Sequence, residues 1–426
     1  MKKFIFSFAV VAAMFASCSQ DADLEIVDNG AKAEAITSVN ASSESGTRAV
    51  VDGTSIKWQT GDKLGVLGTN TSSEAKNTAY TLSSGEGTTT GSFTNNDSEI
   101  NTISATMYPY QEGAAWDATN SKLTLEIPSV QTGVKGSFDP KAAIMYAFGS
   151  STDQALKLAV NFLKVTIGAG ETNVHSITIS STTTVLSGKM EVTSSSVTAA
   201  PEGTFKSVTL TAGANKCFEA GDYYIAVKAG DIVSPYVSYV YYNNDHTATE
   251  KTKAGTTTLA FDGKNVRGIS ANFSSGTVTT RTAVQLWANG PYFAEENVSV
   301  NSSNFVPWQA GMDAWGTSWT IPSEAQMRDL FNESTFNWAQ NPNGTDYGFK
   351  FTGKALGYAS VSLFLPSVSG IARTGSARYW SGTTDGETQA RYVLLVFNAN
   401  GGNSNLNSSW SSLDRTNDYF VRLVLR

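Results

Sequence analysis

Apolar and polar residues alternate along most of the chain between residues 49 and 262. Runs rich in Val, Ile, Thr, Tyr and Phe follow a period of two, and Gly, Asn, Asp and Ser separate them at short intervals. A period of two predicts strands with one buried face. The clearest examples are residues 222–227 and 236–242, and helical periodicity is almost absent from this range. We therefore predict a mainly β fold here.

The pattern changes in residues 281–426. Ser323 followed by Gln326 forms a capping box, which predicts a helix over residues 321–331. The apolar face of this helix would consist of Met327, Leu330 and Phe331. Further strands are predicted at residues 363–366, 379–381, 392–397 and 420–425. Seven of the nine tryptophans also lie in this part of the chain, so we predict a separate, small α+β module with an aromatic core.

The N-terminus has the pattern of an export signal. Two lysines precede an apolar run at residues 4–16, which is too short to span a bilayer and is typical of a secretory signal peptide. The sequence Phe-Ala-Ser-Cys that ends at Cys18 is similar to a bacterial lipobox. Residues 1–17 are thus predicted to be a lipoprotein signal peptide, and lipidated Cys18 would anchor the chain at the outer membrane or cell surface. The alternative is an ordinary signal peptide with an incidental cysteine.

Residues 19–47 are mostly polar, with one weak candidate strand at residues 33–39. Arg48 is the only basic residue between Lys32 and Lys57, and it lies in a tract of Ser, Gly and Thr. Such an arginine is accessible to an arginine-specific protease, which would cut between Arg48 and Ala49. On composition alone, the favoured interpretation of Arg48 is a solvated residue of a linker; the motifs that follow favour cleavage.

Several motifs resemble those of the fimbrillin-like proteins that build type V pili. The motifs are WQTGDKLGV at residues 58–66, ATMYPY at 105–110, LTLEIPSVQTG at 123–133 and LKLAVNFLKVTIG at 156–168. The resemblance implies two tandem transthyretin-like β-sandwiches, at residues 49–154 and 155–262. It also implies a pro-segment with an exchangeable strand, residues 18–48, which a protease removes at Arg48. The implied partners are other pilin subunits and that arginine-specific protease.

A second resemblance covers the C-terminal part. The motifs TIPSEAQMRDLF at residues 320–331, LFLPSVSG at 363–370, YWSGTT at 379–384 and VRLVLR at 421–426 are similar to those of the FISUMP domain. This resemblance implies a C-type-lectin-like fold for residues 281–426, after a linker at residues 263–280. In that family the helix start and the Tyr-Trp-Ser strand are scaffold, so they do not identify a ligand.

Composition restricts the chemistry. A net charge of −7 with scattered Lys and Arg argues against a nucleic-acid partner. The two histidines, His175 and His246, lie outside residues 281–426, which also lack cysteine. Catalysis by Ser-His-Asp or Cys-His groups and a His/Cys zinc site are therefore excluded in the terminal module. Its carboxylates form no suggestive cluster in the sequence. We predict that the protein is not an enzyme, and we predict Cys217 to be a small buried apolar residue.

The best candidate for ligand binding is the Asn-rich stretch at residues 398–410, between two apolar strands. Amides and carboxylates beside a large ring can recognise a glycan, so we predict a loop that binds a host or bacterial surface glycan or protein. The candidate residues are Asn400, Asn403, Asn405, Asn407, Trp410, Asp414, Asn417 and Asp418. The same oxygens suit Ca²⁺, but the Glu-Pro-Asn and Trp-Asn-Asp signatures of calcium-dependent lectins are absent, so no cofactor is predicted. The alternative is a solvated hairpin loop with Trp410 in the core.

Together these features predict a structural and adhesive subunit, at the tip of a type V pilus, that joins the fibre by strand exchange after proteolysis. The protein would be exported as a lipoprotein and then incorporated in the fimbrium. The alternative is a cell-surface glycan-binding lipoprotein that never polymerises. Cleavage after Arg48 distinguishes the two hypotheses, because only the pilus subunit needs it.

Overall fold

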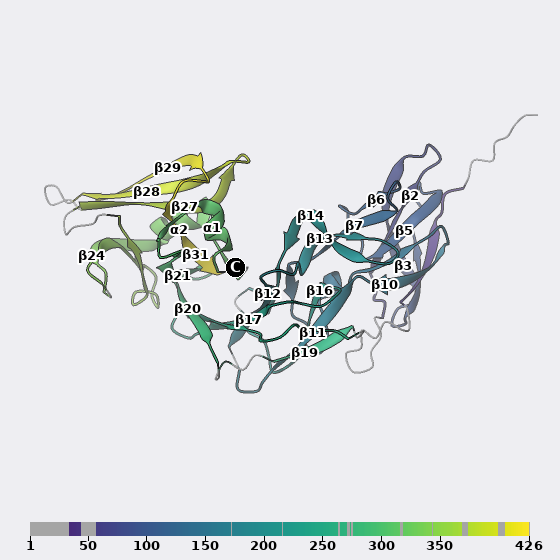
Figure 1. Cartoon of the computed structure of the whole chain (residues 1–426), viewed down its shortest axis with the longest axis horizontal. Coiled ribbons are helices and arrows are strands. Elements are labelled where there is room, and N and C mark those ends of the chain that lie inside the picture. Colours follow the sequence, from purple (N-terminus) through teal and green to yellow (C-terminus); the bar gives the residue numbers. More distant parts are fainter. Residues whose placement is uncertain are drawn as a thin grey trace, which may run out of the picture. The chain divides into compact units, whose positions relative to one another are not determined.

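Strands dominate the structure, and the predicted mainly β fold is confirmed. The computed structural model describes residues 34–43, 57–171, 173–214, 216–262, 265–270, 273, 276–315, 318–342, 344–368, 374–398 and 405–425 (Figure 1). Cys18, Arg48, Ala49, Asn400 and Asn403 lie outside the described residues. Within the described residues there are two α-helices and one short 3-10 helix, at Pro140–Ala142.

Seven strands form a closed barrel, in the order β1 (Ser38–Ser43), β10 (Asp153–Leu158), β9 (Met145–Phe148), β5 (Thr102–Tyr108), β2 (Lys63–Thr69), β3 (Ala75–Ser84) and β4 (Thr90–Thr94). Buried residues alternate with more exposed ones in β1, β4 and β10, as the period of two predicts, whereas β2 is buried continuously from Leu64 to Gly68. Trp58 lies at the centre of the interior, with its ring edge-on to Phe93 at 5.1 Å and to Tyr108 at 5.0 Å between centroids. The barrel is therefore filled by aromatic and aliphatic side chains.

A four-stranded sheet crosses the predicted boundary between residues 154 and 155. Its order is β14 (Val197–Phe205), β13 (Ser187–Val192), β7 (Lys122–Ile127) and β6 (Ala115–Asp117). Met190 and Val192 on β13 belong to the same hydrophobic core as the barrel. The two predicted sandwiches thus share a sheet and a core, because β7 pairs with β13 from Leu123↔Val192 to Ile127↔Gly188.

The middle of the chain forms two more sheets. One has three strands, β16 (Gly221–Lys228), β11 (Val160–Ile167) and β19 (Val266–Ile269). The other has nine strands, in the order β23 (Trp319–Thr320), β31 (Arg422–Leu425), β21 (Tyr292–Asn297), β20 (Val278–Gln285), β18 (Thr247–Ala254), β17 (Pro235–Tyr242), β12 (Val174–Ser181), β15 (Ser207–Thr211) and β8 (Val130–Thr132). This nine-stranded sheet continues from the middle of the chain into the terminal module.

The terminal module, residues 281–426, adds two sheets and both helices. One sheet has the order β22 (Phe305–Val306), β30 (Tyr419–Phe420), β27 (Thr374–Asp385), β28 (Gln389–Asn398) and β29 (Asn405–Asp414). The other contains β24 (Ser334–Gln340), β25 (Tyr347–Gly353) and β26 (Ser362–Pro366). The helices are α1 (Trp308–Asp313) and α2 (Glu324–Glu333). Trp308, Trp319 and Trp380 are buried, which agrees with the predicted aromatic core.

Helix α2 begins at Glu324, directly after the predicted cap Ser323, so the predicted range of residues 321–331 started three residues too early and ended two too early. The Ser323 hydroxyl accepts from the Gln326 backbone N–H at 3.2 Å, and the Gln326 side-chain oxygen accepts from the Ser323 N–H at 2.8 Å. Met327 and Leu330 are buried on the apolar face. The capping box thus determines where this helix starts, and the amphipathic pattern determines which of its faces is buried.

The predicted linker, residues 263–280, is partly built into sheets. Val266–Ile269 forms β19, which runs parallel to β11. Val278 is the first residue of β20, and Val278–Val284 pairs with β18. Val and Thr are strand formers, so the polar composition of the predicted linker was a poor guide to the structure of Val278, Thr279 and Thr280.

The junction between β18 and the terminal module contains a buried carboxylate. Glu250 is 1% exposed and accepts from the Trp319 indole N–H at 2.7 Å. Arg281 on β20 lies 3.2 Å from the same carboxylate oxygen, and its guanidinium lies 4.8 Å from the ring centroid of Trp315. A buried charge is tolerated only when it is paired and hydrogen-bonded. The contacts of Glu250 with Trp319 and Arg281 therefore join the terminal module to β18.

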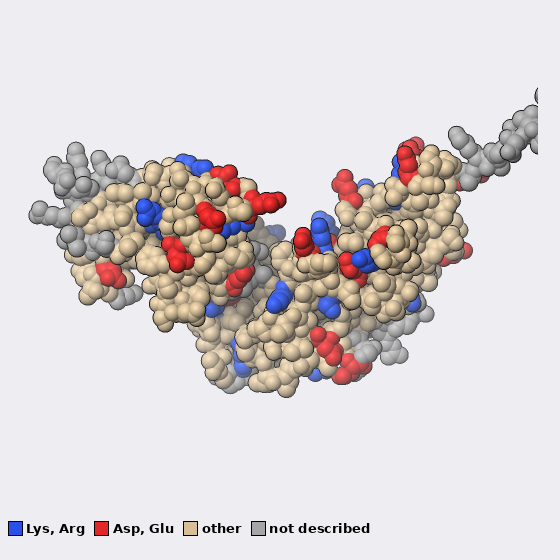
Figure 2. Space-filling view, turned by 45° about the horizontal axis from the view of Figure 1, so that its top comes forward, with Lys and Arg blue, Asp and Glu red and all other residues tan. Residues whose placement is uncertain are grey.

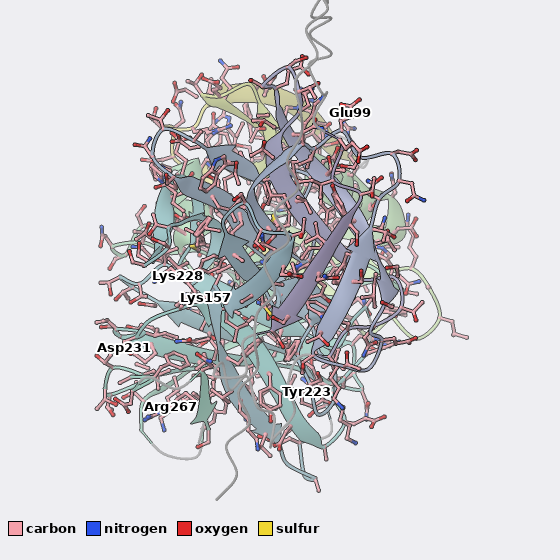
Figure 3. All side chains as sticks on the ribbon, turned by 90° about the vertical axis from the view of Figure 1, so that its right-hand side faces the viewer. Glu99, Lys157, Tyr223, Lys228, Asp231 and Arg267 are labelled. Atoms are coloured by element: carbon pink, nitrogen blue, oxygen red, sulfur yellow. The ribbon has the colours of Figure 1, made fainter. Side chains whose placement is uncertain are left out.

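Acidic and basic side chains are interspersed on the face shown in Figure 2. Several form surface pairs, such as Lys76 with Glu99 at 2.7 Å; Glu99 precedes β5 and is labelled in Figure 3. Screened surface pairs contribute little to stability. Among the helices of the described residues, none combines the length and apolar character needed to cross a membrane.

Candidate functional site

Strand β1 comes from the predicted pro-segment and fills a place in the barrel wall. It pairs antiparallel with β4 from Ser38↔Thr94 to Ser42↔Thr90. On its other side it pairs in parallel with β10, from Asn40↔Asp153 to Ser43↔Leu156. Removing β1 would therefore leave two unpaired strand edges facing each other across one empty position. The predicted strand at residues 33–39 began too early, since β1 covers residues 38–43.

Few side chains of β1 contribute to the core. Val39 and Ala41 are 1% and 2% exposed, whereas Ser38 and Asn40 point to solvent. Full burial of a valine side chain stabilises by about 1.5–3 kcal/mol, and alanine contributes less. Fixing the backbone costs roughly 1–2 kcal/mol per residue. The side chains alone are thus a weak anchor for this six-residue strand.

Hydrogen bonds supply the rest of the attachment. Apart from the strand ladders, the Ile36 N–H donates to the Ile100 carbonyl at 2.7 Å, and the Tyr80 hydroxyl donates to the Ile36 carbonyl at 2.5 Å. On the outside, the Asn40 amide donates to the Asp153 carboxylate at 2.8 Å. These bonds are mostly to backbone groups, so another strand of different sequence could make the same ones.

The space beneath β1 is shaped by Trp58. Gly91 on β4 pairs with Ala41, and a Cβ added at Gly91 would lie 2.8 Å from the Trp58 Cδ1 atom and 2.7 Å from the Leu82 Cδ1 atom. Cross-strand partners point to the same face of a sheet, so Ala41 also points toward this crowded part of the core. Val39 lies opposite Phe93. The groove between β4 and β10 that holds β1 thus has room for a branched side chain at position 39 and a small one at position 41.

The predicted ligand loop differs from the structure. Residues 405–410 belong to β29, which pairs with β28 from Gln389↔Asp414 to Asn398↔Asn405. Asn405 and Asn407 are therefore strand residues. The prediction of a loop over this stretch was wrong because Ser and Asn occupy both faces of an edge strand, which leaves no apolar alternation to detect.

The remaining candidate residues of that set form a packing contact and a turn. Trp410 is half-buried, and the Arg328 guanidinium on α2 lies 4.7 Å from its ring centroid. The Asp414 carboxylate accepts from the Thr416 N–H at 2.9 Å and from its hydroxyl at 2.7 Å, and these bonds lower the Asp414 pKa. The Asn417 amide donates to the Asp414 carbonyl at 2.9 Å, and Asp418 is exposed. The structure does not bring these residues together around a cavity.

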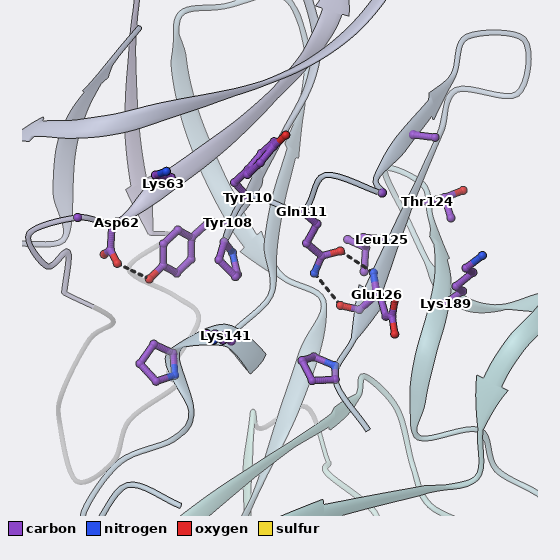
Figure 4. Close-up of a pocket in the computed structure, with 16 residues that line it drawn as sticks. Asp62, Lys63, Tyr108, Tyr110, Gln111, Thr124, Leu125, Glu126, Lys141 and Lys189 are labelled. Atoms are coloured by element: carbon purple, nitrogen blue, oxygen red, sulfur yellow. Dashed lines mark hydrogen bonds between the residues drawn. The ribbon is translucent and has the colours of Figure 1, made fainter. Parts of the chain in front are cut away.

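A cavity of about 880 Å³ opens beside the barrel and is shown in Figure 4. The Tyr108 hydroxyl donates to the Asp62 carboxylate at 2.9 Å, and burial together with the Asp62 charge raises the Tyr108 pKa. The Gln111 amide donates to the Glu126 carbonyl at 2.7 Å and accepts from the Glu126 N–H at 2.8 Å. The Gln111 side chain thus pairs with the β7 backbone at Glu126, beyond the last β6 pair at Ala115↔Thr124. Asp62, Tyr108 and Gln111 therefore already have hydrogen-bond partners within the protein.

A second cavity, which the sequence analysis missed, lies between the middle of the nine-stranded sheet and the terminal module. Its volume is about 790 Å³, and Tyr242, Trp287, Asn289, Tyr292, Gln326 and Asp329 line it. The signal in the sequence was the aromatic group around Trp287-Ala288-Asn289-Gly290-Pro291-Tyr292, which has the turn residues of a loop beside two large rings. We call it the interdomain cleft.

The two histidines have structural partners. The His175 Nδ1–H donates to the Lys216 carbonyl at 2.7 Å, and burial lowers the His175 pKa. His246 packs on the ring of Tyr358, with 4.0 Å between centroids. In the described part of the chain, no three His, Cys, Asp or Glu residues are placed to hold a metal ion. Cys217 is half-buried, which is less than the full burial predicted for it.

No family model, curated protein or solved structure matches this chain.

Proposed function

We propose that this protein is a structural and adhesive subunit of a type V pilus, with two transthyretin-like sandwiches in tandem and a C-type-lectin-like terminal module. The observation that carries the proposal is the position of β1. It precedes Arg48 in the sequence, completes the barrel, and buries only Val39 and Ala41 fully. A strand of this kind is suited to being a temporary occupant of its groove.

Cleavage would change the thermodynamics of this strand without changing any contact. While the chain is intact, β1 is tethered to the barrel and has a high effective concentration, on the order of millimolar for a short linker. After a cut at Arg48 the strand becomes a separate peptide, and its loss is favoured by dilution. A subunit that offers a strand with more apolar side chains could then occupy the two edges of β4 and β10.

The arrangement of β31 supports placement at the fibre tip. Residues 422–425 are buried, and β31 is hydrogen-bonded between β21 and β23. A strand held between two neighbours is not available for donation to another subunit. The groove of β1 makes this chain an acceptor, while the terminal module remains displayed for adhesion.

The test is incorporation of an Arg48→Ala variant into pili, measured by immunogold labelling and by ladder formation on a gel without boiling. We expect a folded, exported protein that stays out of the fibre, because its own β1 keeps the groove filled. Lys57→Ala is the matched control, since it removes the next basic residue and should polymerise normally. Normal incorporation of uncleaved Arg48→Ala protein would refute strand exchange and favour the non-polymerising surface lipoprotein.

A further inference from the structure

The walls of the interdomain cleft are built from aromatic rings. The rings of His175 and Tyr242 stack with 4.0 Å between centroids and 10° between planes, and Tyr242 stacks on Tyr292 at 4.5 Å and 24°. The Lys216 carbonyl holds His175 through Nδ1, which fixes one end of this row. Tyr242 is half-buried, whereas His175 and Tyr292 are buried. His175 and Tyr292 therefore cover the two faces of Tyr242, and the Tyr242 ring borders the cavity with its edge.

Trp287 forms a second wall and is held in place by its own loop. A Cβ added at Gly290 would lie 2.5 Å from the indole ring, so the ring packs directly on the backbone of this glycine. The Gly290 N–H donates to the Trp287 carbonyl at 3.1 Å, and the Gln285 amide donates to the Gly290 carbonyl at 2.8 Å. A side chain at position 290 would displace the indole, so the glycine leaves the half-buried Trp287 ring beside the cavity.

Polar groups reach the cleft from α2 and from the loop after β20. Gln326 and Asp329 are neighbours on one side of α2, at i and i+3. The Gln326 side-chain oxygen accepts a hydrogen bond in the capping box, so the NH₂ group of this side chain is the part that can donate to a ligand. Asp329 and Asn289 are exposed, and Asn289 sits at a positive φ of 61°. Amide and carboxylate groups therefore face the same cavity as the rings.

The charge of the residues that line the cleft argues against an anionic ligand, and their polarity argues against a purely apolar one. Asp329 is the only charged group among the described residues that line the cleft, since burial lowers the pKa of His175. An anionic ligand would face this carboxylate, with no basic residue among the described lining residues to offset it. A purely apolar ligand would remove the Asp329 carboxylate from water without a replacement hydrogen bond.

We propose that the interdomain cleft binds a neutral oligosaccharide. A sugar ring would stack on Trp287, and the hydroxyls of the ligand would bond to Asn289, Gln326 and Asp329. This assignment gives the adhesive part of the proposed function its ligand class, and it places the site away from Trp410. It does not depend on strand exchange, because a monomer contains the whole cleft.

The experiment titrates the purified monomer with lactose, N-acetyllactosamine and mannotriose as neutral probes and with sialyllactose as an anionic probe. Binding is followed by calorimetry and by tryptophan fluorescence. At least one neutral probe should bind, and sialyllactose should bind more weakly than lactose. Asp329→Ala should weaken binding about tenfold or more, since a hydrogen bond to a charged group contributes about 1.5–3 kcal/mol. Asn289→Ala should weaken it less.

Asp346→Ala is the matched control, because it removes an exposed carboxylate of the same module that does not line the cleft. It should leave binding unchanged. Both cleft positions are exposed, so folding should persist, and thermal unfolding verifies this. The proposal is overturned if no neutral probe binds the native monomer, if sialyllactose binds more tightly than lactose, or if folded Asp329→Ala and Asn289→Ala proteins bind normally. None of these outcomes bears on whether Arg48→Ala enters a fibre, so the two proposals fail independently.

Discussion

Ala41 on β1 lies directly across from Gly91 on β4, and the Trp58 ring occupies the place where a side chain at Gly91 would be. Three residues far apart in the sequence thus share one small space inside the barrel. The large Trp58 ring requires small residues at positions 41 and 91. The fit between β1 and its groove therefore depends on the small size of Ala41 as well as on the burial of Val39.

Gly91→Ala should destabilise the uncleaved protein by about 1–3 kcal/mol, because the new methyl group overpacks against Trp58 and Leu82. Urea denaturation measures this loss as a lower midpoint with an unchanged slope. Gly113→Ala is the control. A Cβ at Gly113 meets nothing within 4 Å, so its effect should stay within about 0.5 kcal/mol. Equal effects at the two positions would contradict the crowding at Trp58.

Val39→Ala should accelerate the loss of β1 once the chain has been cut. Val39 is 1% exposed, and removing its buried methyl groups costs roughly 1–3 kcal/mol. Each 1.4 kcal/mol corresponds to about a tenfold change in the equilibrium. Purified protein is cut with an arginine-specific protease, and peptide release is followed over time by mass spectrometry. Ser38→Ala should release its peptide at the native rate, because Ser38 is exposed. Identical release from all three proteins would show that side chains do not hold β1.

Glu250→Gln should change how stability depends on pH. Burial raises the pKa of Glu250, against the opposing effects of Trp319 and Arg281. A carboxyl group whose folded pKa lies above its unfolded value binds protons more tightly in the folded state, so its contribution to stability is lost as pH rises through the folded pKa. The native protein should therefore lose stability relative to the variant as pH increases from about 4.5, the unfolded value. Denaturation at pH 4 to 8 measures the difference in unfolding free energy between the native protein and the variant. A native protein that becomes more stable relative to the variant as pH rises over this range would contradict the prediction.

Cys18→Ala should abolish incorporation of labelled lipid and block or misroute export, because the predicted lipobox ends at this residue. Metabolic labelling with a fatty-acid analogue measures the first effect, and surface proteolysis of intact cells measures the second. Cys217→Ala is the natural control, since Cys217 is the other cysteine of the chain and should leave labelling intact. Normal labelling of Cys18→Ala would refute the lipoprotein prediction.

The parts of the fold that the sequence predicted well are those in which local signals agree with tertiary packing. The capping box of α2 and the aromatic and β-branched runs of β16 and β17 are examples, since the same residues satisfy backbone propensity and burial. The prediction failed for β29, a polar edge strand, and for the start of β20, whose partner β18 is distant in sequence. The interdomain cleft was also out of reach, because its lining residues come from segments that only the nine-stranded sheet brings together.

The pairing of β18 with β20 has a mechanical consequence for an adhesive subunit. Seven residue pairs, from Thr247↔Val284 to Lys253↔Val278, join the two strands. A pull applied to the terminal module must break this set of hydrogen bonds, together with the Glu250 contacts, before any connecting peptide can extend. The rate of rupture under load is set by the barrier to unfolding, rather than by the equilibrium stability of the fold. Attachment under fluid flow would then depend on how slowly this one pair of strands separates.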